Sequence, residues 1–123
     1  MLFLKESERE ATRVTPVHGG AGSIRIRHFF KGQSQTGVNL HVWELAPGVS
    51  EGIHIHAGDD NYEETYYFVA GAGEMWIEQE TVPVQAGDAV LVPPGVDHGF
   101  ANTGTDTLKV VLLFGKPLTE RVP

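Results

Sequence analysis

Residues 48–56, GVSEGIHIH, and residues 93–98, PPGVDH, are the two stretches that decide the fold of this chain. The first ends in His54 and His56, and side chains i and i+2 of a β-strand point to the same face. Their Cα atoms are then about 6.6 Å apart at about 3.3 Å per residue, so the two imidazoles can converge on one metal ion at about 2.1 Å. In the second stretch, two prolines and a glycine form a turn that directs His98 into the next extended segment.

Outward from these stretches, hydrophobic residues alternate with a period of two, and no segment past Arg13 has a helical period. Eight or more short strands separated by glycine and proline turns predict an all-β sandwich or barrel. We expect the last strand to be buried on both faces, or nearly so, because its sequence is apolar throughout. The predicted strands cover residues 23–30, 37–45, 52–56, 64–70, 74–80, 81–84, 88–92, 98–102 and 108–114.

The bulk composition describes one domain of 123 residues with a net charge of −7 and no cysteine. The charge argues against nucleic acid and anionic membranes as partners, and the lack of cysteine excludes disulfides and thiolate metal sites. We find no signal peptide and no apolar run of about 20 residues, so we expect a cytoplasmic protein. The predicted divisions are an N-terminal arm at 1–22, a barrel at 23–116 and a C-terminal tail at 117–123.

Glu64 strengthens the prediction of a metal site. It begins a strand on which Tyr66 and Phe68 share its face, and a carboxylate buried on that face needs a partner such as a metal ion. Taken singly, each feature has a simpler interpretation. The histidine pair can lie at the surface, the glutamate can be a solvated loop residue, and His98 can serve the turn.

The combined pattern resembles the two motifs of the cupin superfamily, in the compact single-domain form found in bacteria. Residues 48–71 resemble the first motif: Gly48 is followed after five residues by the histidine pair, and Glu64 is followed after six residues by Gly71. The second is similar to residues 87–102, from Gly87 through the Pro-Pro-Gly turn and His98 to Asn102. One departure is the gap of seven residues between His56 and Glu64, where three or four are usual. It leaves Glu63, Asp59 or Asp60 as alternative carboxylates, although a slip to Glu63 would turn the side chain to the opposite face.

The resemblance implies a double-stranded β-helix, or jelly-roll barrel, with a short N-terminal arm. It also implies one divalent transition metal bound by His54, His56, Glu64 and His98. Three imidazoles and a carboxylate suit Fe, Mn, Ni, Cu, Co or Zn. Two-fold dimers are the commonest oligomers, so we expect a homodimer in which the arm can cross to the partner.

Three functions fit these residues. The first is a dioxygenase-like or isomerase-like enzyme acting on a small organic molecule, with Glu64, Tyr66 and His41 as candidate catalytic residues that move protons. The second is a non-catalytic module that binds a small molecule or a sugar. The third is a barrel whose metal is adventitious. We expect His18 and His28 to be structural or exposed.

Overall fold

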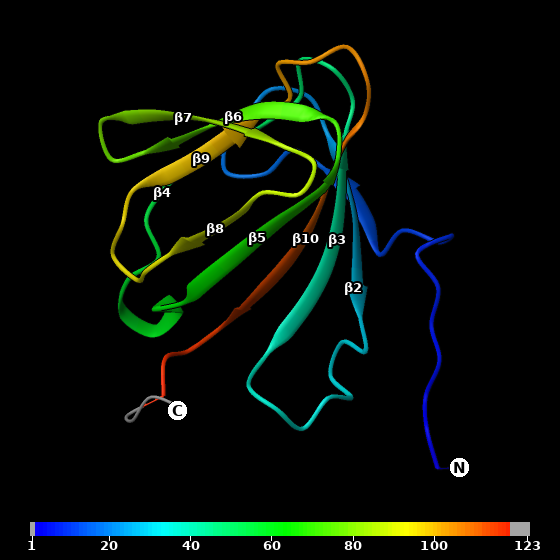
Figure 1. Cartoon of the computed structure of the whole chain (residues 1–123). Helices are drawn as coiled ribbons and strands as arrows, with labels where there is room; N and C mark the ends of the chain where they lie inside the picture. The colour runs from blue at the N-terminus through cyan, green and yellow to red at the C-terminus, as the bar shows by residue number, and fades with distance from the viewer. Residues whose placement is uncertain (1, 119–123) are drawn as a thin grey trace.

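The computed structural model describes residues 2–118, and the regular secondary structure among them is almost wholly β-strand (Figure 1). Each predicted strand has a counterpart, with ends shifted by up to three residues. The chain also contains a short first strand within the predicted arm and one 3-10 turn. The elements are β1 (Arg13–Thr15), β2 (Ile24–Phe29), β3 (Asn39–Leu45), β4 (Ser50–His54), η1 (Gly58–Asp60), β5 (Glu63–Ala70), β6 (Ala72–Ile77), β7 (Glu80–Gln85), β8 (Ala89–Val92), β9 (His98–Ala101) and β10 (Leu108–Gly115).

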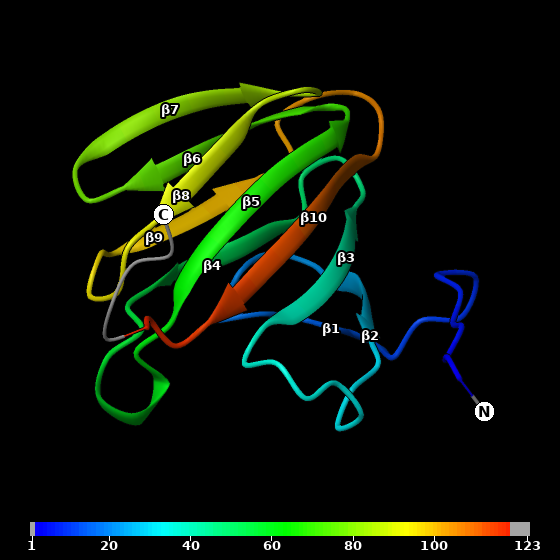
Figure 2. The same cartoon turned by 60° about the horizontal axis from the view of Figure 1, so that its bottom comes forward.

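The strands form two antiparallel sheets that face each other, as Figures 1 and 2 show from two directions. One sheet has the order β1-β2-β3-β10-β5-β8 and the other has the order β4-β9-β6-β7. Neighbours such as β3 and β10 are distant in the sequence, so the chain crosses repeatedly between the sheets. The predicted all-β jelly-roll barrel is therefore confirmed.

The core lies between the two sheets because alternate side chains of each strand point inward. On β5, Tyr66 and Phe68 are fully buried whereas Tyr67 is 46% exposed. On β10, Leu108, Val110 and Leu112 are buried, but Leu113 is 41% exposed. The expectation that this last strand is buried on both faces is therefore wrong. Part of the outer face of the six-stranded sheet is covered by the N-terminal residues, since Arg9 contacts Arg25 and Glu8 contacts Lys109.

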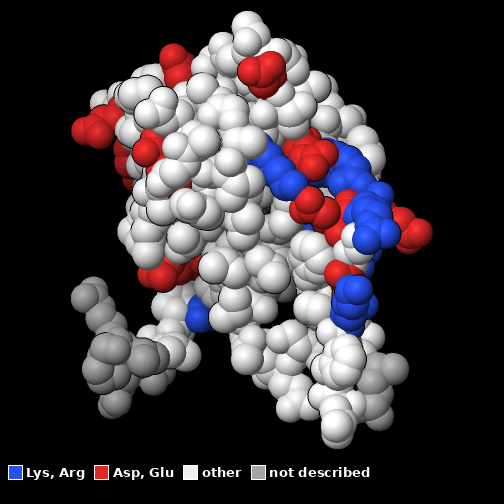
Figure 3. Space-filling view, turned by 45° about the vertical axis from the view of Figure 1, so that its right-hand side comes forward, with Lys and Arg blue, Asp and Glu red and all other residues white. Residues whose placement is uncertain are grey.

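The N-terminal region packs against its own chain. β1 pairs with β2 from Arg13–Ile26 to Thr15–Ile24, and the Arg27 guanidinium contacts the Glu6 carboxylate at 2.6 Å. Basic and acidic side chains lie interleaved on this side of the molecule (Figure 3). The exchange of the arm between two copies stays a prediction.

Two further expectations concern the ends of the chain and the membrane. Residues 119–123 of the predicted tail lie outside the described residues. Within residues 2–118, no helix has the length and hydropathy that crossing a membrane requires.

Candidate metal centre

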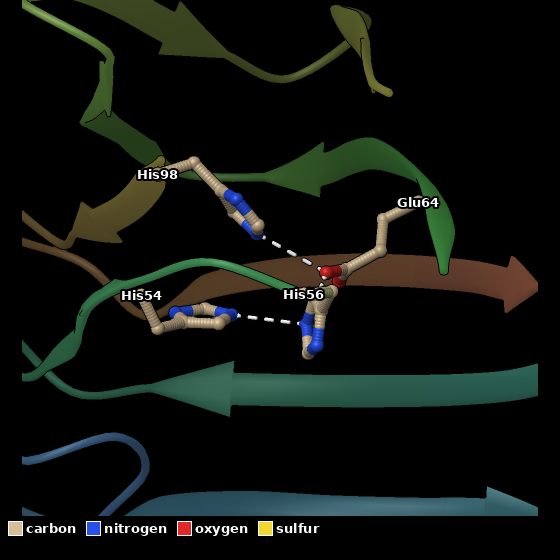
Figure 4. A group of neighbouring side chains, drawn as sticks. All are labelled: His54, His56, Glu64 and His98. Atoms are coloured by element: carbon tan, nitrogen blue, oxygen red, sulfur yellow. Dashed lines mark hydrogen bonds and ion pairs between the residues drawn. The ribbon is translucent and has the colours of Figure 1, made fainter. Parts of the chain in front are cut away.

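The four predicted ligand side chains come from both sheets and meet between them. His54, at the end of β4, is the cross-strand partner of His98, the first residue of β9. His56 lies two residues beyond β4, and Glu64 is the second residue of β5 in the opposite sheet. Figure 4 shows the three imidazoles and the carboxylate pointing toward one another.

The donor atoms have the spacing that a single metal ion requires. The Nε2 atom of His56 lies 2.6 Å from Oε1 of Glu64 and 3.1 Å from Nε2 of His54, and Nε2 of His98 lies 3.1 Å from the same Oε1. With bonds of about 2.1 Å, donors at right angles around an ion are about 3.0 Å apart, and opposite donors about 4.2 Å. All four donors lie within 4.8 Å of one another, so the set fits one ion.

Backbone carbonyl groups orient two of the imidazoles. The Nδ1 atom of His54 lies 2.8 Å from the Gly52 carbonyl oxygen, and Nδ1 of His98 lies 2.8 Å from the Val96 carbonyl oxygen. A carbonyl oxygen only accepts, so each Nδ1 carries a hydrogen, and Nε2 is the nitrogen of each ring that can bind a metal ion when it is deprotonated. Metal-binding histidines are commonly held in this way.

Local charges favour the ligand forms of Glu64 and His54. Burial raises the pKa of Glu64, but the hydrogen bond and charge of His98 and the charge of His56 outweigh it, so the pKa is lowered. Burial lowers the pKa of His54 to about 4. At neutral pH the centre therefore contains an ionised carboxylate and a neutral His54 imidazole, as metal binding requires. For His98, burial lowers the pKa, but the hydrogen bond and charge of Glu64 outweigh it and raise the pKa, so a metal ion must displace a proton there.

The structure places Glu64, rather than the alternative acids, beside the histidines. Glu64 is 3% exposed and shares the inward face of β5 with Tyr66. Glu63 is exposed and lines a groove on the outer side of the sheet. Asp59 and Asp60 belong to the exposed η1 turn. The period of two along β5 therefore selects Glu64, despite the long loop before it.

Tyr66, one of the candidate catalytic residues, lies between two buried carboxyl groups. Its hydroxyl oxygen is 3.0 Å from Oε2 of Glu64 and 3.2 Å from Oε1 of Glu51. Burial, together with the charge of Glu64, raises the pKa of Glu51 well above its ordinary value. Burial likewise raises the pKa of Tyr66. A hydroxyl has one hydrogen, so protonated Glu51 donates to Tyr66, which donates to ionised Glu64.

Glu51 was not identified from the sequence, because the alternation of side chains along a regular strand predicts that it faces away from the histidine ligands. It precedes His54 by three residues, and a regular strand would place the two side chains on opposite faces. The pairing of β4 with β9 is irregular between these residues, and such a bulge re-aims side chains. Both side chains consequently face the interior.

His18 was expected to be structural or exposed, and it is exposed, but it also lies beside the centre. Its ring stacks on the His54 ring with centroids 3.6 Å apart, and its side chain joins Glu51 and His54 in a second group of donor atoms within 4.8 Å. A bridge between Val17 and Glu51 holds this loop against β4. A contact made across more than 30 residues has no local signal in the sequence.

His41, the third candidate catalytic residue, is 3% exposed on β3. Its Nδ1 atom lies 3.0 Å from the indole Nε1 of Trp43. Burial lowers the pKa of His41 to about 3, and the nearby charges of His28 and Arg13 act in the same direction. His41 is therefore a neutral imidazole at neutral pH.

A cavity of about 120 Å³ opens beside the centre. Its walls include two of the four candidate ligands, His56 and Glu64, and the candidate catalytic residue His41. Tyr62 and Phe114 form part of the apolar wall, with their rings 5.3 Å apart. Pockets for drug-sized ligands have volumes of about 300–1,000 Å³, so this cavity suits a compact molecule.

The fold and the centre together define a class of protein, a small jelly-roll barrel with a three-histidine, one-glutamate cluster between its sheets. A family model described as the cupin domain matches residues 41–114. This chain therefore belongs to the cupin family.

Similar proteins agree with this assignment. An uncharacterised protein of Methanocaldococcus jannaschii is 29% identical over 111 residues, which are 90% of this chain and 87% of that protein. The crystal structure of a predicted oxalate decarboxylase from Thermotoga maritima has a TM-score of 0.74 at 25% identity, covering 88% of this chain and 97% of that one. A cupin 2 conserved barrel domain protein from Salinispora arenicola has a TM-score of 0.73 at 20% identity over 94% of this chain and 90% of its own, which shows a common fold.

Proposed function

We propose that this cupin is a metal-dependent enzyme acting on a small organic molecule. The observation that carries the proposal is the convergence of His54, His56, Glu64 and His98 beside a cavity that contains further proton-holding groups. A divalent metal bound there would supply Lewis acidity. A site that served only to hold a metal would need no buried acid beyond its ligands.

The chain's own residues support an isomerase-like reaction, in which a proton moves within the substrate. Glu51 lines the cavity, is 1% exposed and keeps its proton because of its burial. It is therefore placed to act as a general acid. Tyr66 connects it to Glu64 by hydrogen bonds of 3.2 and 3.0 Å. If Glu64 takes the proton that leaves the substrate, that proton can pass through the Tyr66 hydroxyl and replace the one that Glu51 has donated. The predicted proton transfer by Tyr66 then takes the form of a relay.

A dioxygenase-like reaction is the second form of the proposal. The similar protein from Thermotoga maritima is itself a predicted oxalate decarboxylase. The isomerase-like and dioxygenase-like reactions differ in the metal ion that they need. An oxygen-dependent reaction needs a redox-active ion such as iron or manganese, whereas isomerisation proceeds with zinc.

The test begins with elemental analysis of the protein purified without a metal-affinity tag. We expect about one transition metal ion per chain, and loss of that ion in the His98→Ala variant, which removes one of the three imidazoles. His28→Gln is the matched control because His28 lies on β2 outside the cluster. A metal content below one-tenth per chain, or one unchanged by His98→Ala, refutes the proposal.

Turnover is then measured on the metal-loaded protein with a panel of small hydroxy acids, keto acids and sugars. Proton NMR in D₂O detects isomerisation and exchange at carbon, and an oxygen electrode detects oxygen consumption. We expect exchange or product in NMR that is lost in Glu51→Gln while the metal content is kept. Oxygen consumption would support the dioxygenase-like form. A protein that binds members of the panel but converts none would be a binding module.

A further inference from the structure

The cavity beside the metal centre contains a hydrogen-bond donor that has no partner. An indole N–H only donates, so Nδ1 of His41 must accept the hydrogen bond from Trp43. The neutral His41 ring therefore carries its hydrogen on Nε2. That nitrogen is buried and has no hydrogen-bond partner among residues 2–118. A buried donor without a partner is costly, which indicates that a ligand atom supplies the acceptor.

A second donor, the Arg13 guanidinium, lines the same cavity. The neighbouring Arg25 and Arg27 guanidinium groups are held by the Arg9 carbonyl oxygen and the Glu6 carboxylate. Within the described part of the chain, Arg13 has no such hydrogen bond or ion pair. β1 places it at the cavity through its pairing with Ile26 of β2. An arginine with free donors at a cavity mouth is suited to bind a carboxylate.

The charges around the cavity favour an anion. The cavity wall contains two carboxyl groups, those of Glu51 and Glu64, and the guanidinium of Arg13. A divalent ion bound at the centre would offset both carboxyl groups, and Arg13 adds a further positive charge. A net positive charge at a partly enclosed site attracts anions, even though the whole chain carries −7.

From these observations we infer that the substrate is a compact organic carboxylate. Its carboxylate is bound by Arg13 and His41 Nε2–H, and another oxygen faces the metal ligands across a cavity of about 120 Å³. Arg13 and His41 are thus specificity-determining residues. This inference rests on the proposed function, because the same cavity and the same metal centre are used.

The test is equilibrium binding to cobalt(II)-loaded protein, followed by calorimetry and by the visible spectrum of cobalt. The probes are malonate and succinate, with malonamide and succinamide as uncharged analogues of matched size. We expect at least one dicarboxylate to bind tenfold or more tightly than its diamide, because charge-assisted hydrogen bonds are the strong ones. A perturbed cobalt spectrum would locate the ligand at the centre.

Variants separate the carboxylate contact from the metal contact. We expect Arg13→Gln to weaken dicarboxylate binding tenfold or more and to leave diamide binding unchanged, with Arg13→Lys restoring part of the loss. His41→Leu should weaken binding similarly, whereas His41→Gln keeps a donor and an acceptor and should bind more tightly than His41→Leu. Arg25→Gln is the control, since it removes the same charge from a side chain that does not line the cavity.

The outcomes distinguish the two proposals. If the wild-type protein holds cobalt but binds diacids no better than diamides, or if Arg13→Gln and Arg25→Gln behave alike, the carboxylate inference is overturned and the metal-dependent function stands. If the protein holds no cobalt at a one-to-one ratio, both are overturned.

Discussion

The His41→Gln substitution gives a direct measure of the burial of this imidazole. In the unfolded chain the pKa of His41 returns to about 6.5, whereas in the folded protein burial lowers it to about 3. Between these values the unfolded state binds a proton that the folded state rejects, so the free energy of unfolding rises with pH. The contribution is fully present above the unfolded pKa and is lost as the pH falls below it.

The magnitude follows from the two pKa values. Well below pH 6.5, each further pH unit of acidification costs about 1.4 kcal/mol. From pH 7 to pH 5, His41 alone therefore lowers the free energy of unfolding by about 2 kcal/mol. Glutamine does not titrate, and its amide can still accept the hydrogen bond from Trp43. The variant should lack this pH dependence while keeping the local contact.

The assay is urea unfolding at pH 7, 6 and 5, performed on wild-type and His41→Gln protein after treatment with EDTA. We expect the wild type to lose about 2 kcal/mol relative to the variant over this range. The other titrating groups are common to both proteins and cancel in the difference. Parallel pH profiles would refute the assignment of His41 as a buried, neutral imidazole, and with it the tautomer argument for its Nε2 donor.

Three further predictions concern the remaining parts of the centre. Tyr66→Phe removes the hydroxyl between two buried carboxyl groups, so chemical denaturation should show a loss of about 1–3 kcal/mol; an unchanged midpoint would contradict the hydrogen-bonded line. Gly52→Ala places a methyl group 1.9 Å from the His18 carbonyl oxygen, so it should lower the melting temperature and displace the loop, whereas Gly37→Ala, with open space around it, should do neither. Metal removal by EDTA should lower the melting temperature by about 10 °C, because an ion at 100 times its Kd stabilises by about 2.7 kcal/mol; equal melting curves with and without metal would indicate an adventitious ion.

Local periodicity in the sequence determined the class of fold, and the resemblance to the two cupin motifs implied the positions of the candidate ligands. Alternation along residues 64–70 places Glu64 on the inward face, and the Pro-Pro-Gly turn directs His98 into its strand. These are properties of neighbouring residues, so they are readable without the fold. The long loop before Glu64 lengthened a connection and left the strand register intact.

Only the tertiary structure decided what surrounds the ligands. The irregular pairing of β4 turns Glu51 inward, and a loop bridge brings His18 onto His54. The hydrogen bond from Trp43 selects the tautomer of His41, and burial keeps that ring neutral. The alternation of polar and apolar residues in the sequence does not predict bulges, contacts between distant segments or the loss of solvent around a side chain. These three features shape the cavity, and they exist only once the two sheets have packed together.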